Sequence, residues 1–330
     1  MKVQPTHYHS IGHRNYRVDT ERFGLISTAG ESNITYVDDQ RVVHSVPGNW
    51  KRLFAPAILD RDQGQQRLAV THWDGLSIVD PSGTVIFECS VPESEFRDPS
   101  HRCYFSDCYF DPQLKELWLA TSLSGKQYEL MILDTKTWVF TYRRVVDDLF
   151  TNSDQTFYPT FNAGVVGMDL TTGGCGEEVF VLDRNNDAIE IENAGIGDSR
   201  YAVFSPWAKK FVVVEGHTAI IGYSYPGVGC YGASEDLCEQ FDEHSGREGS
   251  SVGSSMAFVS PYKLLITNDD VLAILDLHTW RIEDTVEVEL PESLRSEHPS
   301  PIDWTWFIPM HEAIAFWHED GFFTVPRDQF

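Results

Sequence analysis

The chain has 330 residues, of which 50 are acidic and 25 basic, so its formal net charge at pH 7 is −25. A charge of this sign and size excludes nucleic acid and anionic membrane surfaces as expected partners, because both would be repelled, but it allows a basic protein. Aromatic residues make up 13% of the sequence, which favours strands because rings pack well on pleated surfaces.

Neither the N-terminal residues nor any later segment has the apolar length of a signal-peptide core or a membrane span, so we expect a cytoplasmic protein. The six cysteines are then expected to be reduced thiols. None of them belongs to a Cys-x-x-Cys pair, the usual half of a structural zinc site, and we predict no metal and no cofactor. The alternative is a site at His7, His9 and His13, because alternate residues of a strand point to one side.

Runs of strand-forming residues group, in chain order, into seven similar repeats. The repeats fall at residues 23–46, 55–87, 104–146, 157–193, 199–228, 254–289 and 302–325. The clearest of them has strands at residues 255–259, 263–267, 271–275 and 280–288, separated by short turns. The fourth repeat is the least regular, because its first strand, near Pro159, has the weakest pattern.

Prolines mark the repeat length. An apolar strand ending in proline, then a short turn and a second apolar strand, occurs at Pro112, Pro206, Pro261 and Pro309. Pro159 lies midway between the first two, so the spacings are 47, 47, 55 and 48 residues. A four-stranded propeller blade has about this length, and such a period indicates an array whose repeats bury their faces against neighbours.

The third strand of several repeats ends in a shared turn. Asp80, Asp134 and Asp276 each close an apolar strand, and the last two are followed by Thr-Trp, at Trp138 and Trp280. This turn resembles that of WD40-like and YVTN-like β-propellers, although the Gly-His and Trp-Asp dipeptides typical of WD40 blades do not occur at the expected places. The resemblance implies an all-β fold, a single closed β-propeller of four-stranded blades, and it carries no functional residues across.

Seven blades are preferred, and six are the alternative, because the last repeat offers only three strands. Ring closure removes exposed sheet edges, so a strand within residues 3–18 is expected to close the last blade. If that segment must also supply a strand of the first repeat, the count falls to six. We treat residues 1–330 as a single β-propeller domain with a Gly/Ser-rich acidic insertion at about 226–255, whose middle fits a short helix or the fourth strand of its blade.

Two short motifs match known patterns without the context that those patterns need. Residues 249–253 spell Gly-x-Ser-x-Gly, but a nucleophile elbow requires a strand before it and a helix after it. Residues 183–187 place oxygen ligands at calcium-loop spacing, yet Ala188 and Ala194 stand where the glycine and the bidentate glutamate belong. A tight turn between strands is the favoured interpretation of the second motif.

The most informative pattern lies in the turns expected between the second and third strands, which share one face of a propeller. These seven segments carry nine acidic and two basic side chains, an excess that the turn preference of aspartate explains only in part. The predicted partner-binding residues of this acidic rim are Glu31, Trp73, Asp74, Asp187, Glu215, His217, Asp269, Asp270, Glu319 and Asp320. The leading hypothesis is a non-catalytic scaffold that docks a basic protein partner there, in one version as an inhibitor or immunity-type protein.

The rival hypothesis is a propeller hydrolase, lactonase-like or glycosidase-like, with its site in the central channel. Such a site needs carboxylates or histidines that converge from the innermost strands. Those strands, around Phe110, Phe204 and Phe258, are mostly apolar, with Asp111 and Asp303 as the only evident acids. No catalytic residue is therefore predicted.

Overall fold

The computed structural model describes residues 1–5, 7–10, 16–19, 24–29, 33–37, 43–50, 53–59, 66–93, 104–124, 127–147, 153–160, 162–172, 177–185, 188–193, 199–216, 218–246, 251–253, 255–268, 271–292, 303–309, 313–318 and 321–330. The chain forms two compact units. One comprises Asn15–Asp19 and Gly24–Ile191 and is called the 24–191 unit below. The other comprises Met1–Arg14, Thr20–Phe23 and Glu192–Phe330 and is called the 192–330 unit.

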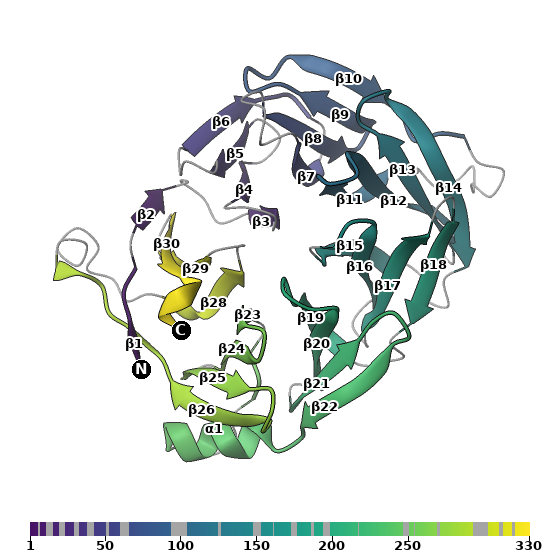
Figure 1. Cartoon of the computed structure of the whole chain (residues 1–330). Helices are drawn as coiled ribbons and strands as arrows, with labels where there is room; N and C mark the ends of the chain where they lie inside the picture. The colour runs from purple at the N-terminus through teal and green to yellow at the C-terminus, as the bar shows by residue number, and fades with distance from the viewer. Residues whose placement is uncertain are drawn as a thin grey trace. The chain divides into compact units, whose positions relative to one another are not determined.

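The 24–191 unit contains four antiparallel sheets of four strands each, in chain order (Figure 1). The first is β3 (Tyr16–Asp19), β4 (Gly24–Ala29), β5 (Asn33–Val37) and β6 (Val43–Pro47). The second is β7 (Leu53–Leu59), β8 (Arg67–His72), β9 (Gly75–Val79) and β10 (Val85–Cys89). The third is β11 (Phe105–Asp111), β12 (Glu116–Ser124), β13 (Gln127–Asp134) and β14 (Val139–Asp147), and the fourth is β15 (Ser153–Pro159), β16 (Val165–Thr172), β17 (Glu177–Asn185) and β18 (Ala188–Asn193).

The 192–330 unit contains three such sheets. They are formed by β19 (Ser199–Phe204), β20 (Lys210–Glu215), β21 (Ala219–Ser224) and β22 (Gly229–Ser234); by β23 (Met256–Ser260), β24 (Lys263–Thr267), β25 (Leu272–Asp276) and β26 (Arg281–Thr285); and by β28 (Asp303–Pro309), β29 (Ala313–His318) and β30 (Gly321–Pro326) with β2 (His7–Ser10). Helix α1 (Leu237–Ser245) follows β22, β1 (Lys2–Val3) pairs in parallel with β27 (Glu287–Val288), and the 3₁₀ helix η2 (Arg327–Gln329) ends the chain.

Seven four-stranded antiparallel sheets match a seven-bladed β-propeller, which confirms the all-β prediction and the preferred count. The N-terminal segment supplies a strand to each of two four-stranded sheets, not to one. Strand β2 completes the last sheet as expected, because His7 pairs with Thr324 and Ser10 with Gly321 on β30. Strand β3 completes the first sheet beside β4, so one segment serves both sheets without lowering the count to six.

The buried apolar side chains lie between neighbouring sheets, as the strand alternation requires. In the 24–191 unit, Leu76 and Ile78 of β9 belong to one cluster with Leu117 of β12 and Leu133 of β13. In the 192–330 unit, a comparable cluster joins β20, β21, β23 and β24 and includes Phe241 of α1. Each fully buried leucine, isoleucine or phenylalanine contributes about 1.5–3 kcal/mol to the hydrophobic free energy of folding.

The shared aspartate turn is built the same way in both units. Oδ1 of Asp134 accepts hydrogen bonds from the backbone N–H of Lys136 and Thr137, at 2.8 and 2.7 Å. Oδ1 of Asp276 accepts the equivalent bonds from His278 and Thr279, both at 2.8 Å. The residue that then closes each turn, Trp138 or Trp280, has a left-handed backbone with a φ of 57°.

The tryptophan of this turn packs against the sheet before it. Trp138 stacks on Phe87 of β10, with the ring centroids 5.0 Å apart. Trp280 lies against β22 so closely that a Cβ atom added to Gly232 would be 2.1 Å from its Nε1 atom. Only glycine fits at this position, because the indole occupies the space of a side chain.

The middle of the predicted insertion forms a helix, one of the two elements expected there, and the fourth strand of the sheet lies before it. Gly229–Ser234 forms β22, the fourth strand of its sheet, and the acidic segment after it forms helix α1. The helix buries Leu237 and Phe241 and lies along β26, the outer strand of the next sheet. The side chain of Gln240 is also buried, and its Oε1 accepts a hydrogen bond from the backbone N–H of Ile282 at 2.7 Å.

Candidate functional site

The structure describes three residues of the predicted acidic rim, namely Trp73, Asp74 and Glu215. Trp73 and Asp74 form the turn between β8 and β9, and Glu215 ends β20 at the turn to β21. Asp74 is exposed, whereas Trp73 and Glu215 are half-buried. The remaining predicted residues lie outside the described residues: Glu31, Asp187, His217, Asp269, Asp270, Glu319 and Asp320.

The topology corrects the place of Asp187. Six of the seven predicted segments connect the second and third strands of their sheets, as expected. The connection that contains Asp187 instead joins β17 to β18, the third and fourth strands, because β15 near Pro159 is the first strand of this sheet. Successive antiparallel strands reverse direction, so this connection belongs to the end of the sheet opposite to its second-to-third turn.

Trp73 is one of three aromatic rings that stack at one end of two sheets. Phe54 lies near the start of β7, and Tyr104 directly precedes β11. The ring centroids of Phe54 and Tyr104 are 4.2 Å apart with planes inclined by 8°, and those of Trp73 and Tyr104 are 5.6 Å apart at 20°. All three side chains are half-buried, so the stack forms a rigid, partly apolar surface beside exposed Asp74. We call Phe54, Trp73, Asp74 and Tyr104 the Trp73 surface.

A buried histidine supports the turn under this surface. Nδ1 of His72 accepts a hydrogen bond from the backbone N–H of Asp74 at 3.3 Å, so the proton of the neutral ring lies on Nε2. Nε2 is 2.8 Å from the hydroxyl oxygen of Ser77, which therefore accepts. Burial lowers the pKa of His72, while the carboxylates of Glu88 and Asp74 act in the opposite direction. A neutral imidazole that donates to Ser77 does not activate it as a nucleophile, because a general base must accept the hydroxyl proton.

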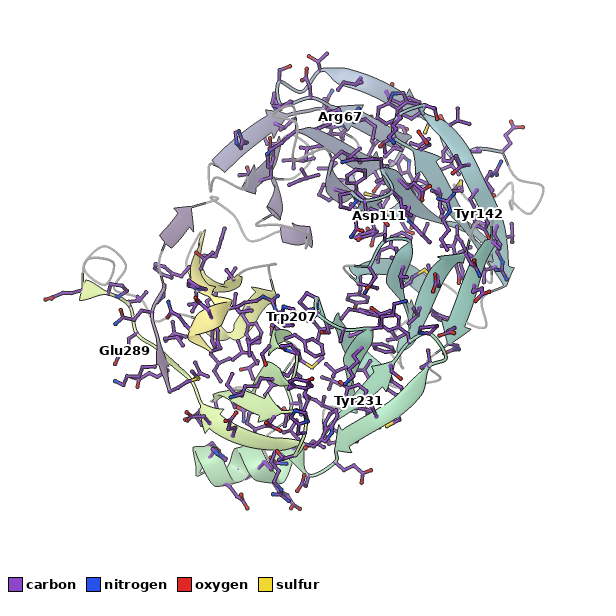
Figure 2. All side chains as sticks on the ribbon, in the orientation of Figure 1. Arg67, Asp111, Tyr142, Trp207, Tyr231 and Glu289 are labelled. Carbon is purple, nitrogen blue, oxygen red and sulfur yellow. The ribbon has the colours of Figure 1, made fainter. Side chains whose placement is uncertain are left out.

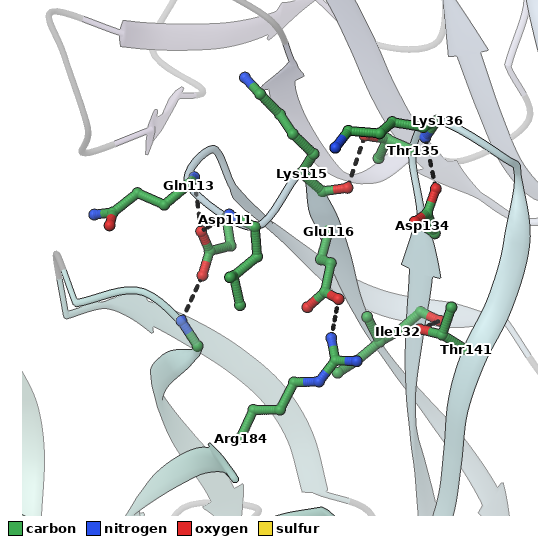
Figure 3. Close-up of polar contacts among 12 residues, drawn as sticks. Asp111, Gln113, Lys115, Glu116, Ile132, Asp134, Thr135, Lys136, Thr141 and Arg184 are labelled. Carbon is green, nitrogen blue, oxygen red and sulfur yellow. Dashed lines mark hydrogen bonds and ion pairs between the residues drawn. The ribbon is translucent and has the colours of Figure 1, made fainter. Parts of the chain in front are cut away.

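The acids of the innermost strand β11 are occupied by backbone groups. Asp107 is 1% exposed, and its two oxygens accept from the N–H of Cys108 at 2.6 Å and of Phe157 at 2.7 Å. Asp111 is 2% exposed; Oδ1 accepts from the N–H of its own turn, and Oδ2 accepts from Gly164 at 2.7 Å (Figure 3). Both carboxylates thus join β11 to the next sheet of the 24–191 unit. The sequence pointed to Asp111 and missed Asp107.

Two further buried carboxylates form ion pairs. Glu116 of β12 pairs with Arg184 of β17, which also joins the third and fourth sheets (Figure 3). Glu129 of β13 binds Arg143 of β14 through both oxygens, at 2.8 and 3.1 Å. Both carboxylates are thus held by arginines of the same unit. They serve the fold, and they give no support to a hydrolase site in this unit.

The predicted histidine cluster is only partly within the described residues. His7 and His9 occupy alternate positions of β2, and His13 lies outside the described residues. Of the Gly-x-Ser-x-Gly motif, only residues 251–253 are described, and they lie in neither a strand nor a helix. Within the part of the chain that the structure describes, no three His, Cys, Asp or Glu side chains gather as metal ligands would. The only α-helix found there has nine residues, and no helix is long and apolar enough to cross a membrane.

No protein-family model matches the chain, and no curated protein matches it in sequence. What the chain does must therefore be inferred from its own residues.

Proposed function

We propose that the protein is a non-catalytic β-propeller scaffold, of the WD40-like or YVTN-like kind, that docks a basic protein partner at the second-to-third turns of its sheets. The observation that carries this proposal is the Trp73 surface, where three stacked rings and an exposed carboxylate lie on rigid strands. Loops held by a rigid scaffold are where such folds place binding residues.

The aromatic part of the surface suits a contact with another protein. A half-buried tryptophan offers a large apolar area at a small cost in side-chain entropy, and tryptophan is enriched among the residues that dominate binding energy. Trp73 is held from one side by Tyr104, whose carbonyl accepts a hydrogen bond from Thr121 at 2.6 Å. Its turn is also fixed by His72, so little order has to be gained on binding.

The negative charge of the turns predicts a basic partner. In the 192–330 unit, the three second-to-third turns carry Glu215, Asp269, Asp270, Glu319 and Asp320 and no lysine or arginine. Clustered carboxylates sum to a field that attracts a basic surface and speeds association. One form of this function is an inhibitor or immunity-type protein that neutralises a basic effector in the cytoplasm.

The test is affinity capture from native lysate with quantitative mass spectrometry, using the wild-type chain and a Trp73→Ala/Asp74→Lys variant as baits. The matched control is Glu235→Lys, which reverses an exposed charge just before α1. We expect a basic protein to be captured by the wild type and the control but lost by the double variant. If every captured protein is retained equally by all three baits, the Trp73 surface is not the docking site.

A further inference from the structure

Two exposed aromatic side chains stand at the opposite end of the sheets in the 192–330 unit. The turn from β19 to β20 contains Trp207, and the turn from β23 to β24 contains Tyr262. These side chains are 47% and 50% exposed, among the largest values for apolar residues in the described chain. Figure 2 labels Trp207 and, on the outer strand β22, Tyr231.

The same local device presents both rings. Each turn reads Ser-Pro-aromatic, and the serine hydroxyl accepts a hydrogen bond from the backbone N–H of the aromatic residue. This bond is 3.3 Å long from Trp207 to Ser205 and 3.3 Å long from Tyr262 to Ser260. A side-chain bond of this kind fixes a turn without using the aromatic side chain, which is left directed away from the sheet.

Among the described residues, each ring has one stacking or cationic partner. The guanidinium carbon of Arg327 lies 5.5 Å from the centroid of Trp207, and Arg327 also donates to the carbonyl of Phe258 on β23. Arg327 thereby links the turn after β19 to strand β23, and β19 and β23 are in contact. Burial lowers the pKa of Arg327 to about 10, so it is still a cation at pH 7. Tyr262 stacks on His278 with the centroids 4.3 Å apart.

The charged residues around these rings are mainly basic. Lys209 is exposed, and no carboxylate pairs with it among the described residues. Lys210 lies 4.4 Å from the ring centroid of Tyr231. Of the described acids beside these turns, Asp276 uses Oδ1 to accept the N–H groups of its own turn, and Glu283 pairs with Lys263 at 2.6 Å. This positive character is local, since the whole chain carries −25.

We propose that Trp207, Lys209, Lys210, Tyr262 and His278 form a second docking surface that binds an acidic peptide segment of another protein. The apolar rings would cover an aliphatic side chain of the segment, and the lysines would pair with carboxylates beside it. A short segment with a few carboxylates fits this local patch, whereas a long polyanion such as nucleic acid meets the repulsion of the whole chain. This surface is separate from the Trp73 surface and does not depend on the function proposed for it.

The test is a fluorescence-anisotropy titration of the full chain with a fluorescein-labelled synthetic peptide in which glutamates flank two leucines. The comparison peptide has glutamine in place of each glutamate, because a basic peptide could also bind the acidic turns. We expect the acidic peptide to bind more tightly than the neutral one. Trp207→Ala and Lys209→Glu should each weaken the acidic peptide by about tenfold, and raising the salt from about 50 to about 500 mM should weaken it further.

Three controls make the result specific. Lys136→Glu reverses an exposed lysine in a turn of the 24–191 unit, and Trp73→Ala alters the other surface; both should leave the peptide affinity unchanged. Trp207→Phe should restore most of the affinity lost in Trp207→Ala. This result would show that the loss comes from the missing aromatic contact and not from misfolding. The proposal is overturned if the two peptides bind equally, if Lys209→Glu binds like the wild type, or if a single-stranded oligonucleotide competes as well as the acidic peptide.

Discussion

Carboxylates occupy two kinds of position in these sheets, and the two kinds differ in what the oxygens contact. On the innermost strand β11 and in the turns after the third strands, the oxygens of Asp107, Asp134 and Asp276 accept backbone N–H groups. In the turn between β8 and β9, it is the ring of His72 that accepts the backbone N–H, and Asp74 is exposed. An acid whose oxygens accept backbone N–H groups therefore stabilises the fold. An exposed acid in a turn that is held by other side chains is a candidate for binding a partner.

The largest loss of stability is expected for a substitution of Asp107 on the inner strand β11. Asp107→Ala leaves the buried N–H groups of Cys108 and Phe157 without acceptors, so the free energy of unfolding should fall by about 2–4 kcal/mol. Asp74→Ala should change it by less than about 0.5 kcal/mol. Urea denaturation of both variants measures this, and Asp107→Asn, which keeps one acceptor, should lie between them. Equal losses for Asp107→Ala and Asp74→Ala would remove the distinction.

The shared turns should show a smaller loss. Replacing Asp134 or Asp276 with alanine removes the acceptor of two backbone N–H groups in each turn and loosens the left-handed residue that follows. Because these groups are partly exposed and water can replace the carboxylate, we expect about 1–2 kcal/mol per turn in urea denaturation. Asparagine at either position should recover much of this loss, and failure to do so would mean that charge matters more than geometry.

The rim should respond in binding rather than in stability. Replacing Asp269, Asp270, Glu319 and Asp320 with Asn or Gln should hardly change the melting temperature, while the association rate with a basic partner falls about tenfold. At physiological salt the Debye length is about 8 Å, so added salt should slow the wild type towards the variant. Stopped-flow measurements over a salt series test this. An unchanged rate would make these acids ordinary turn residues.

Low pH should slightly reduce the stability that the carboxylates of the shared turns contribute. The N–H of Thr137 lowers the pKa of Asp134, and that of Thr279 lowers the pKa of Asp276, both from an ordinary value of 3.8. A carboxyl group whose pKa is lower in the folded state stabilises the fold above 3.8, and this contribution is lost as the pH falls below that value. The free energy of unfolding should therefore fall less steeply below pH 3.8 in Asp134→Asn/Asp276→Asn than in the wild type. Parallel slopes would contradict the assignment.

Local signals carried the prediction of the fold. Proline after an apolar strand and aspartate before Thr-Trp are patterns of a few consecutive residues, and they correctly predicted the sheets and the shared turns. The turn containing Asp187 was misplaced because the first strand of its sheet, β15, has a weak pattern, and one strand decides which end a turn occupies. Assigning Gly229–Ser234 as β22 was difficult for a similar reason, since glycine-rich strands look like loops.

Some residues of the sites could not be predicted from the sequence, because they depend on contacts between residues far apart in the chain. Tyr104 stacks on Trp73 from a different sheet, and no local pattern links the two rings. Asp107 lies in an otherwise apolar strand, and its partner Phe157 is 50 residues away. Trp207 and Tyr262 follow prolines that mark the repeats, but that they are exposed depends on how the turns fold. The Ser-Pro-aromatic pattern that the two turns share is visible in the sequence and could have pointed to both residues.

Helix α1 has a consequence for how copies of this chain meet one another. An outer strand normally presents a row of N–H and C=O groups that a strand from another molecule can pair with, which is a common start of aggregation. On β26 the amide carbonyl of Gln240 already takes the N–H of Ile282, and the helix occupies the place where a foreign strand would lie. Gln240→Ala should therefore raise the tendency of the protein to self-associate more than it lowers its stability, a liability that light scattering at high concentration would detect.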